Sequence, residues 1–227
     1  YFRRYYVPNN VAICMAGDFN PDKVIAIIDK YFGDWKSKGT VTFPSFAPVK
    51  PLTTPADTSV VGLEAENVML RWTTNAGNSA DIDTLQVVAK MLSNGKAGLF
   101  DINLNTPMKV MSAGAELNTM HDYGIFLLYG VPKQGQSLDN VKKLLLDEII
   151  KLKHGFFSDD LLPSVVNNMT LSFYESLRDN DSRASRFVNA YVNDCDWADR
   201  VHAISRISKM TKQQIVDFAR RFFLDDY

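Results

Sequence analysis

Hydrophobic positions divide the chain into a first part that mixes short apolar runs with helices and a last part, after Pro132, that is helical. The run Val11–Ala16 is continuous, has the length of a strand and predicts a buried strand. In the next segment Asn20 precedes Pro21 and apolar residues recur at helical spacing, which predicts a helix that ends near Gly33.

Prolines interrupt this pattern between residues 36 and 58. They stand at 44, 48, 51 and 55 in a stretch without helical period, which is typical of an extended linker. A single strand and helix cannot bury both of their faces. We therefore expect residues 1–46 to be the C-terminal remnant of a preceding domain, residues 47–57 to be a Pro-rich linker, and residues 58–227 to form a second domain.

The second domain begins with β-type segments. Val60–Leu63 and Asn67–Trp72 predict two strands or one bulged strand, and Ser79 is the expected N-cap of a helix that ends at Gly95. The segment Leu99–Leu104 is a shorter predicted helix. Val110–Pro132 predicts a β-hairpin whose turn is Met120–Gly124.

Helical stripes follow to the end of the chain. The expected helix starts are Ser137, Ser158–Asp160, Asp181 or Ser182, Asp196, and Thr211, where Gln214 completes a capping box. Strands followed by a series of helices predict an α+β fold, a mainly antiparallel sheet with helices packed on one face.

The first arm of the hairpin is unusual because it contains the small-residue segment Ser112–Ala115. Glycine and alanine in a strand mark a bulge, a bend or a site where another backbone comes close. Two explanations stay open. The strand is a docking edge for an extended peptide, or it is small so that a helix can lie tightly on it.

Composition excludes several classes of protein. The 227 residues are 46% hydrophobic and 22% charged with a net charge of −1, so the basic stripe expected of a nucleic-acid-binding surface is missing. The longest apolar runs, such as Ile125–Tyr129, are too short to span a membrane. Two cysteines, Cys14 and Cys195, do not make a disulfide framework.

No catalytic or metal-binding motif stands in the sequence. His121, His154 and His202 are far apart, whereas a zinc site on one helix face needs two imidazoles a turn apart with a carboxylate. We interpret His121-Asp122 as a turn pair and His154 as a helix C-terminal residue. The sequence thus offers no catalytic residue and no metal ligand.

Three blocks at the start of the chain resemble the insulinase (pitrilysin) family of zinc metallopeptidases. They are Tyr5–Val11, Ala16–Phe19 and Lys30–Trp35, which are similar to the family stretch that closes the zinc domain and leads into the next one. The likeness continues more loosely through Leu92–Gly95 to the C-terminal helices.

The resemblance implies that these residues are part of a longer protein, here called the parent, and it implies a function for the parent rather than for this segment alone. The family's zinc motif, His-x-x-Glu-His, does not occur in these residues. The resemblance therefore implies a non-catalytic unit of the parent's N-terminal half, inactive alone. Zinc is expected in the absent domain, and the partners are the parent's own zinc domain and C-terminal half, with peptides as substrates. The compartment stays unknown.

In related peptidases the unit in this position holds the N-terminal end of a substrate in an exosite. The resemblance maps it onto two segments, Ser93-Asn94-Gly95 and Ala113-Gly114-Ala115-Glu116. Glu116 would attract a free α-amino group, although a charge on a strand edge also guards against aggregation. Gly114→Val is expected to weaken peptide binding and to leave the fold intact.

Two alternatives to a peptidase unit remain. The first is a scaffold or assembly subunit with the same architecture and no peptidase activity, because the family includes such members. The second is an unrelated peptide-binding domain, which the block Tyr5–Val11 disfavours.

Overall fold

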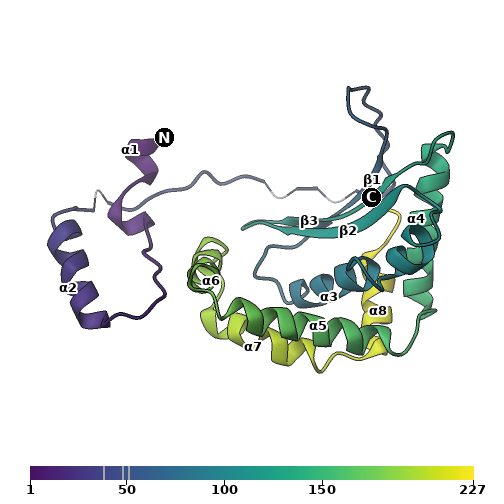
Figure 1. Ribbon diagram of the computed structural model, residues 1–227. Helices are drawn as coiled ribbons and strands as arrows, with labels where there is room; N and C mark the ends of the chain where they lie inside the picture. The colour runs from purple at the N-terminus through teal and green to yellow at the C-terminus, as the bar shows by residue number, and fades with distance from the viewer. Residues whose placement is uncertain (38, 48, 51) are drawn as a thin grey trace.

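A three-stranded antiparallel sheet lies at the centre of residues 58–227, with the strand order β1-β3-β2 (Figure 1). Strand β1 covers Val68–Thr74, β2 covers Ser112–Thr119 and β3 covers Gly124–Val131. The computed structural model describes residues 1–37, 39–47, 49–50 and 52–227. The predicted hairpin is confirmed as β2 and β3.

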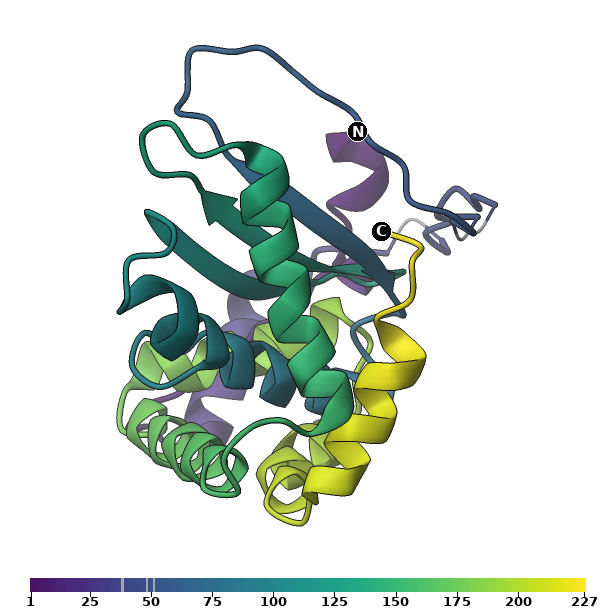
Figure 2. The same ribbon diagram turned by 90° about the vertical axis from the view of Figure 1, so that its right-hand side faces the viewer.

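The two faces of the sheet differ in what covers them. Phe126 and Leu128 of β3 are fully buried against the helices, and Trp72 pairs with Phe126 on the same face. Leu127 and Tyr129 point to the other, outer face and are partly exposed. Figures 1 and 2 show the helices that follow β1 gathered on one side of the sheet. The predicted α+β class with helices on one face is confirmed.

Several helices begin at the capping residues that the sequence predicts. They are α3 (Ile82–Leu92), the π-helical turn η2 (Asp101–Asn105), α4 (Leu138–His154), α5 (Leu161–Ser176), α6 (Asn180–Val192), α7 (Trp197–Ile207) and α8 (Lys212–Phe222). Ser137 caps α4 by accepting the Asn140 N–H at 3.2 Å, and Gly155 ends it in the left-handed conformation with φ 71°. The Thr211–Gln214 capping box is present at α8.

Three predicted boundaries are wrong. Val60–Leu63 forms no strand and is exposed, because no segment of the described residues supplies hydrogen-bond partners or covers it. The N-cap residue of α3 is Asp81 rather than Ser79, whose hydroxyl instead accepts the Asp81 N–H at 3.2 Å in the preceding turn. Helix α6 starts earlier than expected because Asp179 is its cap and accepts the Ser182 N–H at 2.7 Å.

The core unites the sheet with α3, α4, α8 and the first turns of α5. Its largest fully buried side chains include Phe100, Phe126, Leu85 and Met91. In α5 the buried residues are Leu161, Leu162 and Val165. The rest of α5 continues with α6 and α7 as an arm (Figure 1), and Ile207 at the end of α7 reaches the core.

The first 46 residues contain α1 (Phe2–Tyr5), η1 (Pro8–Asn10) and α2 (Pro21–Phe32). Asn20 caps α2 as predicted, accepting the Lys23 N–H at 3.1 Å, but α2 buries none of its residues. The predicted strand Val11–Ala16 is wrong, because an extended segment becomes a strand only when a neighbouring strand pairs with it. The described residues of the predicted linker 47–57 form neither helix nor strand, and Pro48 and Pro51 lie outside the described residues.

Candidate functional site

Strand β2 contains the second predicted site segment and lies at an edge of the sheet. It pairs with β3 on one side, and no strand of the described residues pairs with its other side. Ala113 and Ala115 face the helices, whereas Gly114 and Glu116 face the outer side, opposite Tyr129 and Leu127. The edge position that the docking hypothesis requires is therefore present.

One position on this edge is already occupied by a side chain. Asn105 of η2 accepts the Ala113 N–H through Oδ1 at 2.8 Å and donates from Nδ2 to the Ala113 carbonyl at 2.9 Å. The primary amide thus pairs with Ala113 as a neighbouring strand would. Because alternate residues of a strand direct their backbone groups to the same side, Ala115 and Leu117 present theirs at the same edge.

A buried carboxylate organises the loop that holds the first predicted site segment. The Asp101 side chain is 5% exposed, and its Oδ2 accepts the N–H groups of Asn94 at 2.9 Å and of Gly98 at 3.0 Å. Gly98 is closely packed, since a Cβ there would lie 2.6 Å from the Leu92 carbonyl oxygen. Gly95 has a φ of 78°, which glycine adopts readily.

These contacts join the two predicted segments through two residues. Asp101 binds the backbone of the loop after Ser93, and its other oxygen lies 3.4 Å from the Asn105 amide that covers Ala113. Sequence reasoning missed Asp101 and Asn105. Their spacing of four residues, which places them on one side of a helical turn, is the signal that would have indicated them.

The small residues of β2 have two structural explanations. Ala113 is 4% exposed and packs against the helical side, as the tight-packing alternative expects. Gly114 lacks a side chain for another reason, because a Cβ built on it would clash with the ring of Tyr129. A valine at this position would have to displace the end of the partly exposed Tyr129 ring, so the expectation that Gly114→Val leaves the fold intact stays a prediction.

Glu116 lies on the outer face and is exposed. Its carboxylate forms no ion pair within the described residues. Its carboxylate is thus accessible from solvent.

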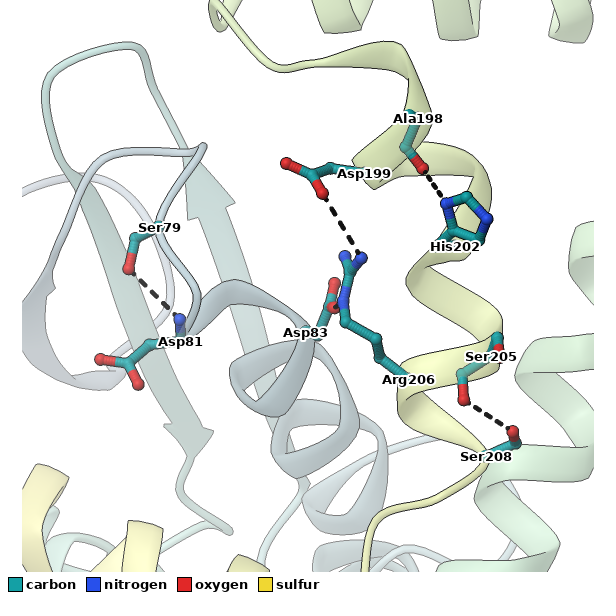
Figure 3. A network of polar contacts seen from close by, with 9 residues as sticks. All are labelled: Ser79, Asp81, Asp83, Ala198, Asp199, His202, Ser205, Arg206 and Ser208. Atoms are coloured by element: carbon teal, nitrogen blue, oxygen red, sulfur yellow. Dashed lines mark hydrogen bonds and ion pairs between the residues drawn. The ribbon is translucent and has the colours of Figure 1, made fainter.

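A groove beside this region separates α3 from the α5–α7 arm. Its volume is about 1070 Å³, and Asn94 and Thr119 line it together with charged residues of α3, α6 and α7. Asp83 of α3 binds Arg206 of α7 at 2.7 Å, and Asp199 lies 3.9 Å from the same guanidinium (Figure 3). The three side chains tie α3 to α7 at one end of the groove.

The histidines occupy unrelated places. His121 contacts Asp122 at 2.7 Å in the exposed hairpin turn, His154 stacks on Phe156, and His202 Nδ1 lies 2.7 Å from the Ala198 carbonyl (Figure 3). Among the described residues no group of three or more His, Cys, Asp or Glu side chains has the arrangement of a metal site. None of the described helices has the length and apolar character needed to cross a membrane.

The first 169 residues match a known family model, "Peptidase M16 inactive domain". The chain belongs to this family. The resemblance to zinc metallopeptidases of the insulinase type is thereby confirmed. The name of the family also agrees with the lack of a catalytic motif in this peptidase M16 inactive domain.

Relatives of this peptidase M16 inactive domain include a curated zinc protease, PqqE of Helicobacter pylori. It is 24% identical over 192 residues, which cover 83% of this chain and 43% of the relative. A solved protease structure from Helicobacter pylori has a TM-score of 0.85 at 22% identity, covering 93% of this chain and 52% of that one. The chain spans about half the length of these relatives.

The same fold also occurs in a chain of a larger complex. A chain in the structure of complex III₂ from Candida albicans has a TM-score of 0.63 at 13% identity, covering 90% of this chain and 50% of that one. At this identity the likeness shows the fold alone. The architecture of the M16 inactive domain is therefore compatible with both a protease and a subunit of another assembly.

Proposed function

We propose that this chain is the non-catalytic, peptide-anchoring unit of a zinc peptidase. The observation that carries the proposal is the edge of β2, where Ala115 and Leu117 offer backbone groups next to the position that Asn105 closes. An extended peptide that adds to such an edge gains main-chain hydrogen bonds that do not depend on its sequence. The unit would form part of the wall of the chamber in which the parent degrades peptides, and it would hold the peptide there.

The site combines the residues predicted from the sequence with the two that the structure adds. Ala113, Gly114, Ala115 and Glu116 supply the edge, Ser93, Asn94 and Gly95 supply the adjoining loop, and Asp101 and Asn105 hold the two together. Glu116 would bind the α-amino group of the peptide, whose positive charge complements the carboxylate.

Zinc and hydrolysis belong to another part of the parent in this proposal. A zinc-bound water would attack the peptide bond in the zinc domain, of which residues 1–46 would be the last part. The zinc domain and the C-terminal half of the parent would be the partners of residues 58–227. The name of the Helicobacter pylori relative, a zinc protease, supports this division.

Backbone-methylated peptides test the edge directly. Two extended peptides of identical sequence are N-methylated at either the odd or the even residues, so that each loses the donors of one edge only. We expect one to bind the 227-residue chain at least about tenfold more weakly than the other, because several main-chain hydrogen bonds are lost. Equal affinities of the two peptides would contradict strand pairing.

A scaffold subunit is the second candidate, favoured by the complex III₂ neighbour. A scaffold does not need a peptide on β2, so it predicts no difference between the two methylated peptides. The coding sequence of the full-length protein gives an independent distinction. A His-x-x-Glu-His motif in a preceding domain would support the peptidase, and its absence from the complete protein would support the scaffold.

A further inference from the structure

The groove between α3 and the α5–α7 arm is lined by an excess of positive charge. Its lining residues include Lys90 of α3, Lys96 of the following loop, Arg186 of α6 and Arg200 of α7. Asp83 is the single carboxylate among the described residues that line it, and Arg206 already binds that carboxylate at 2.7 Å (Figure 3). The groove therefore has four cations without a matching set of anions.

The two arginines are held in place by neutral groups. Arg200 donates to the Gly77 carbonyl at 3.1 Å and lies 2.7 Å from the Cys195 sulfur. Arg186 donates to the Ser176 hydroxyl and lies over the Phe173 ring, 4.7 Å from its centroid. Arg186 is partly buried, and this burial lowers the pKa of its guanidinium because a charge is less stable away from water. A bound anion would offset this cost.

The cations are distributed along the groove. Gln86, Lys90 and Asn94 follow one another on one side of α3 and its C-terminal loop, whereas Arg200 contacts Gly77, before the helix begins. An 11-residue helix is about 16 Å long. Such spacing fits an extended chain with several anionic groups better than one compact anion.

The other lining residues fit a peptide. Amide side chains of α3, α5 and α6 can pair with peptide backbone groups, and Phe173 and Trp197 supply aromatic surface. From these observations we propose that the groove binds an acidic segment of an extended peptide. Thr119, the last residue of β2, lines the groove, and Asn94 of the same lining is linked to Ala113 through Asp101 and Asn105. The segment would therefore continue a peptide that is held at the strand edge.

A purely structural role explains only part of this charge. Lys90 stands in the last turn of α3, where a cation is favoured by the helix dipole. Lys96 lies beyond the helix, and both lysines are exposed and outside every ion pair of the described residues. Their substitution therefore tests binding without threatening the fold.

The test measures fluorescence anisotropy of labelled decapeptides with the 227-residue chain. One peptide carries four glutamates toward one end, and a second carries glutamines at the same positions. We expect the acidic peptide to bind more tightly, and K90Q/K96Q to weaken it about fivefold while leaving the glutamine peptide unchanged. The preference should also decrease as salt is added. The matched control K133Q/K143Q removes two exposed lysines elsewhere and should change neither affinity.

Because this proposal rests on the proposed peptide function, its failure must be distinguishable from failure of that function. Binding of both peptides with equal affinity, or an equal loss in K133Q/K143Q, would overturn the acidic groove and leave the strand edge intact. Binding of neither peptide would overturn both. Pyrophosphate is a third probe, and tighter binding of pyrophosphate than of the acidic peptide would assign the groove to a compact anion and overturn the proposal.

Discussion

The ring of Tyr129 lies against Gly114, its partner across the β2–β3 pair, on the outer face of the sheet. An aromatic ring over a strand glycine covers backbone that the missing side chain leaves exposed. The contact with Tyr129 on the neighbouring strand therefore explains the glycine, which does not by itself indicate that a peptide binds there.

Gly114→Ala should destabilise the chain by about 1–3 kcal/mol, because the added methyl group forces the Tyr129 ring away. In a Tyr129→Leu background the same change should cost clearly less. Urea unfolding of the four variants gives the coupling free energy. Gly62→Ala is the control, since a Cβ there meets no atom within 4 Å. Additive effects of the two substitutions would show that the ring does not restrict position 114.

Asn105→Ala should cost about 2 kcal/mol of unfolding free energy, because the N–H and carbonyl of Ala113 lose their partner. Hydrogen exchange at the Ala113 amide should accelerate as well. Asn118→Ala serves as the matched control, since Asn118 is an exposed residue of the same strand whose side chain makes no hydrogen bond among the described residues. Unchanged exchange at Ala113 would argue against the edge contact.

Asp101→Asn should loosen the loop after α3. The amide oxygen can still accept the two backbone N–H groups, but these bonds lose the carboxylate charge, and the new NH2 group would face the NH2 group of Asn105. We expect a loss of about 2 kcal/mol together with faster hydrogen exchange at Asn94 and Gly98. Asp122→Asn, in the exposed hairpin turn, removes a charge without such contacts to backbone. If Asp122→Asn changes the unfolding free energy and the exchange rates as much as Asp101→Asn does, the effect comes from net charge and not from the loop contacts.

Glu116→Gln should weaken peptides with a free α-amino group about threefold, as expected for one exposed charge pair. Acetylated peptides of the same sequence should bind the original 227-residue chain and the variant with equal affinity. Glu66→Gln controls for net charge. If the acetylated peptides lose as much affinity as the free ones, Glu116 does not contact the terminus.

Asp179→Asn should reduce the pH dependence of stability. The Ser182 N–H lowers the pKa of the Asp179 carboxyl below its ordinary value of 3.8. A lowered pKa in the folded state means stability that is present above the ordinary value and lost as the pH falls through the folded value. Asparagine keeps the cap without titrating.

The stability difference between the original chain and Asp179→Asn should therefore shrink as the pH falls from 5 to below the ordinary Asp pKa of 3.8. Urea unfolding at several pH values in this range measures it. Asp181→Asn, in the first turn of α6, is the control. A difference that stays constant over this range would show that the Asp179 carboxylate does not contribute through its charge.

Elements with a local signal were predictable from the sequence. Asn20, Ser137 and the Thr211–Gln214 pair begin helices as expected, because a cap acts within four residues of its own position. Val11–Ala16 and Val60–Leu63 were not, although both have strand composition. Whether an apolar run becomes a strand depends on a partner elsewhere, which the run itself does not contain.

The candidate site was predictable only in outline. The two segments follow from family resemblance, but the residues that join them depend on contacts between side chains and distant backbone. Asn105 reaches Ala113 only after the chain has turned back, and the contact of Tyr129 with Gly114 depends on the strand register. Neither relationship has a local period that a sequence pattern would reveal.

The contact between Asn105 and Ala113 also limits how a guest strand can be placed. A strand paired with Ala115 and Leu117 cannot slide toward Ser112 without displacing the Asn105 amide. A slip of one residue would exchange the two faces of the guest, because side chains alternate along a strand. One asparagine would therefore decide which guest side chains face outward, even though the hydrogen bonds themselves ignore sequence.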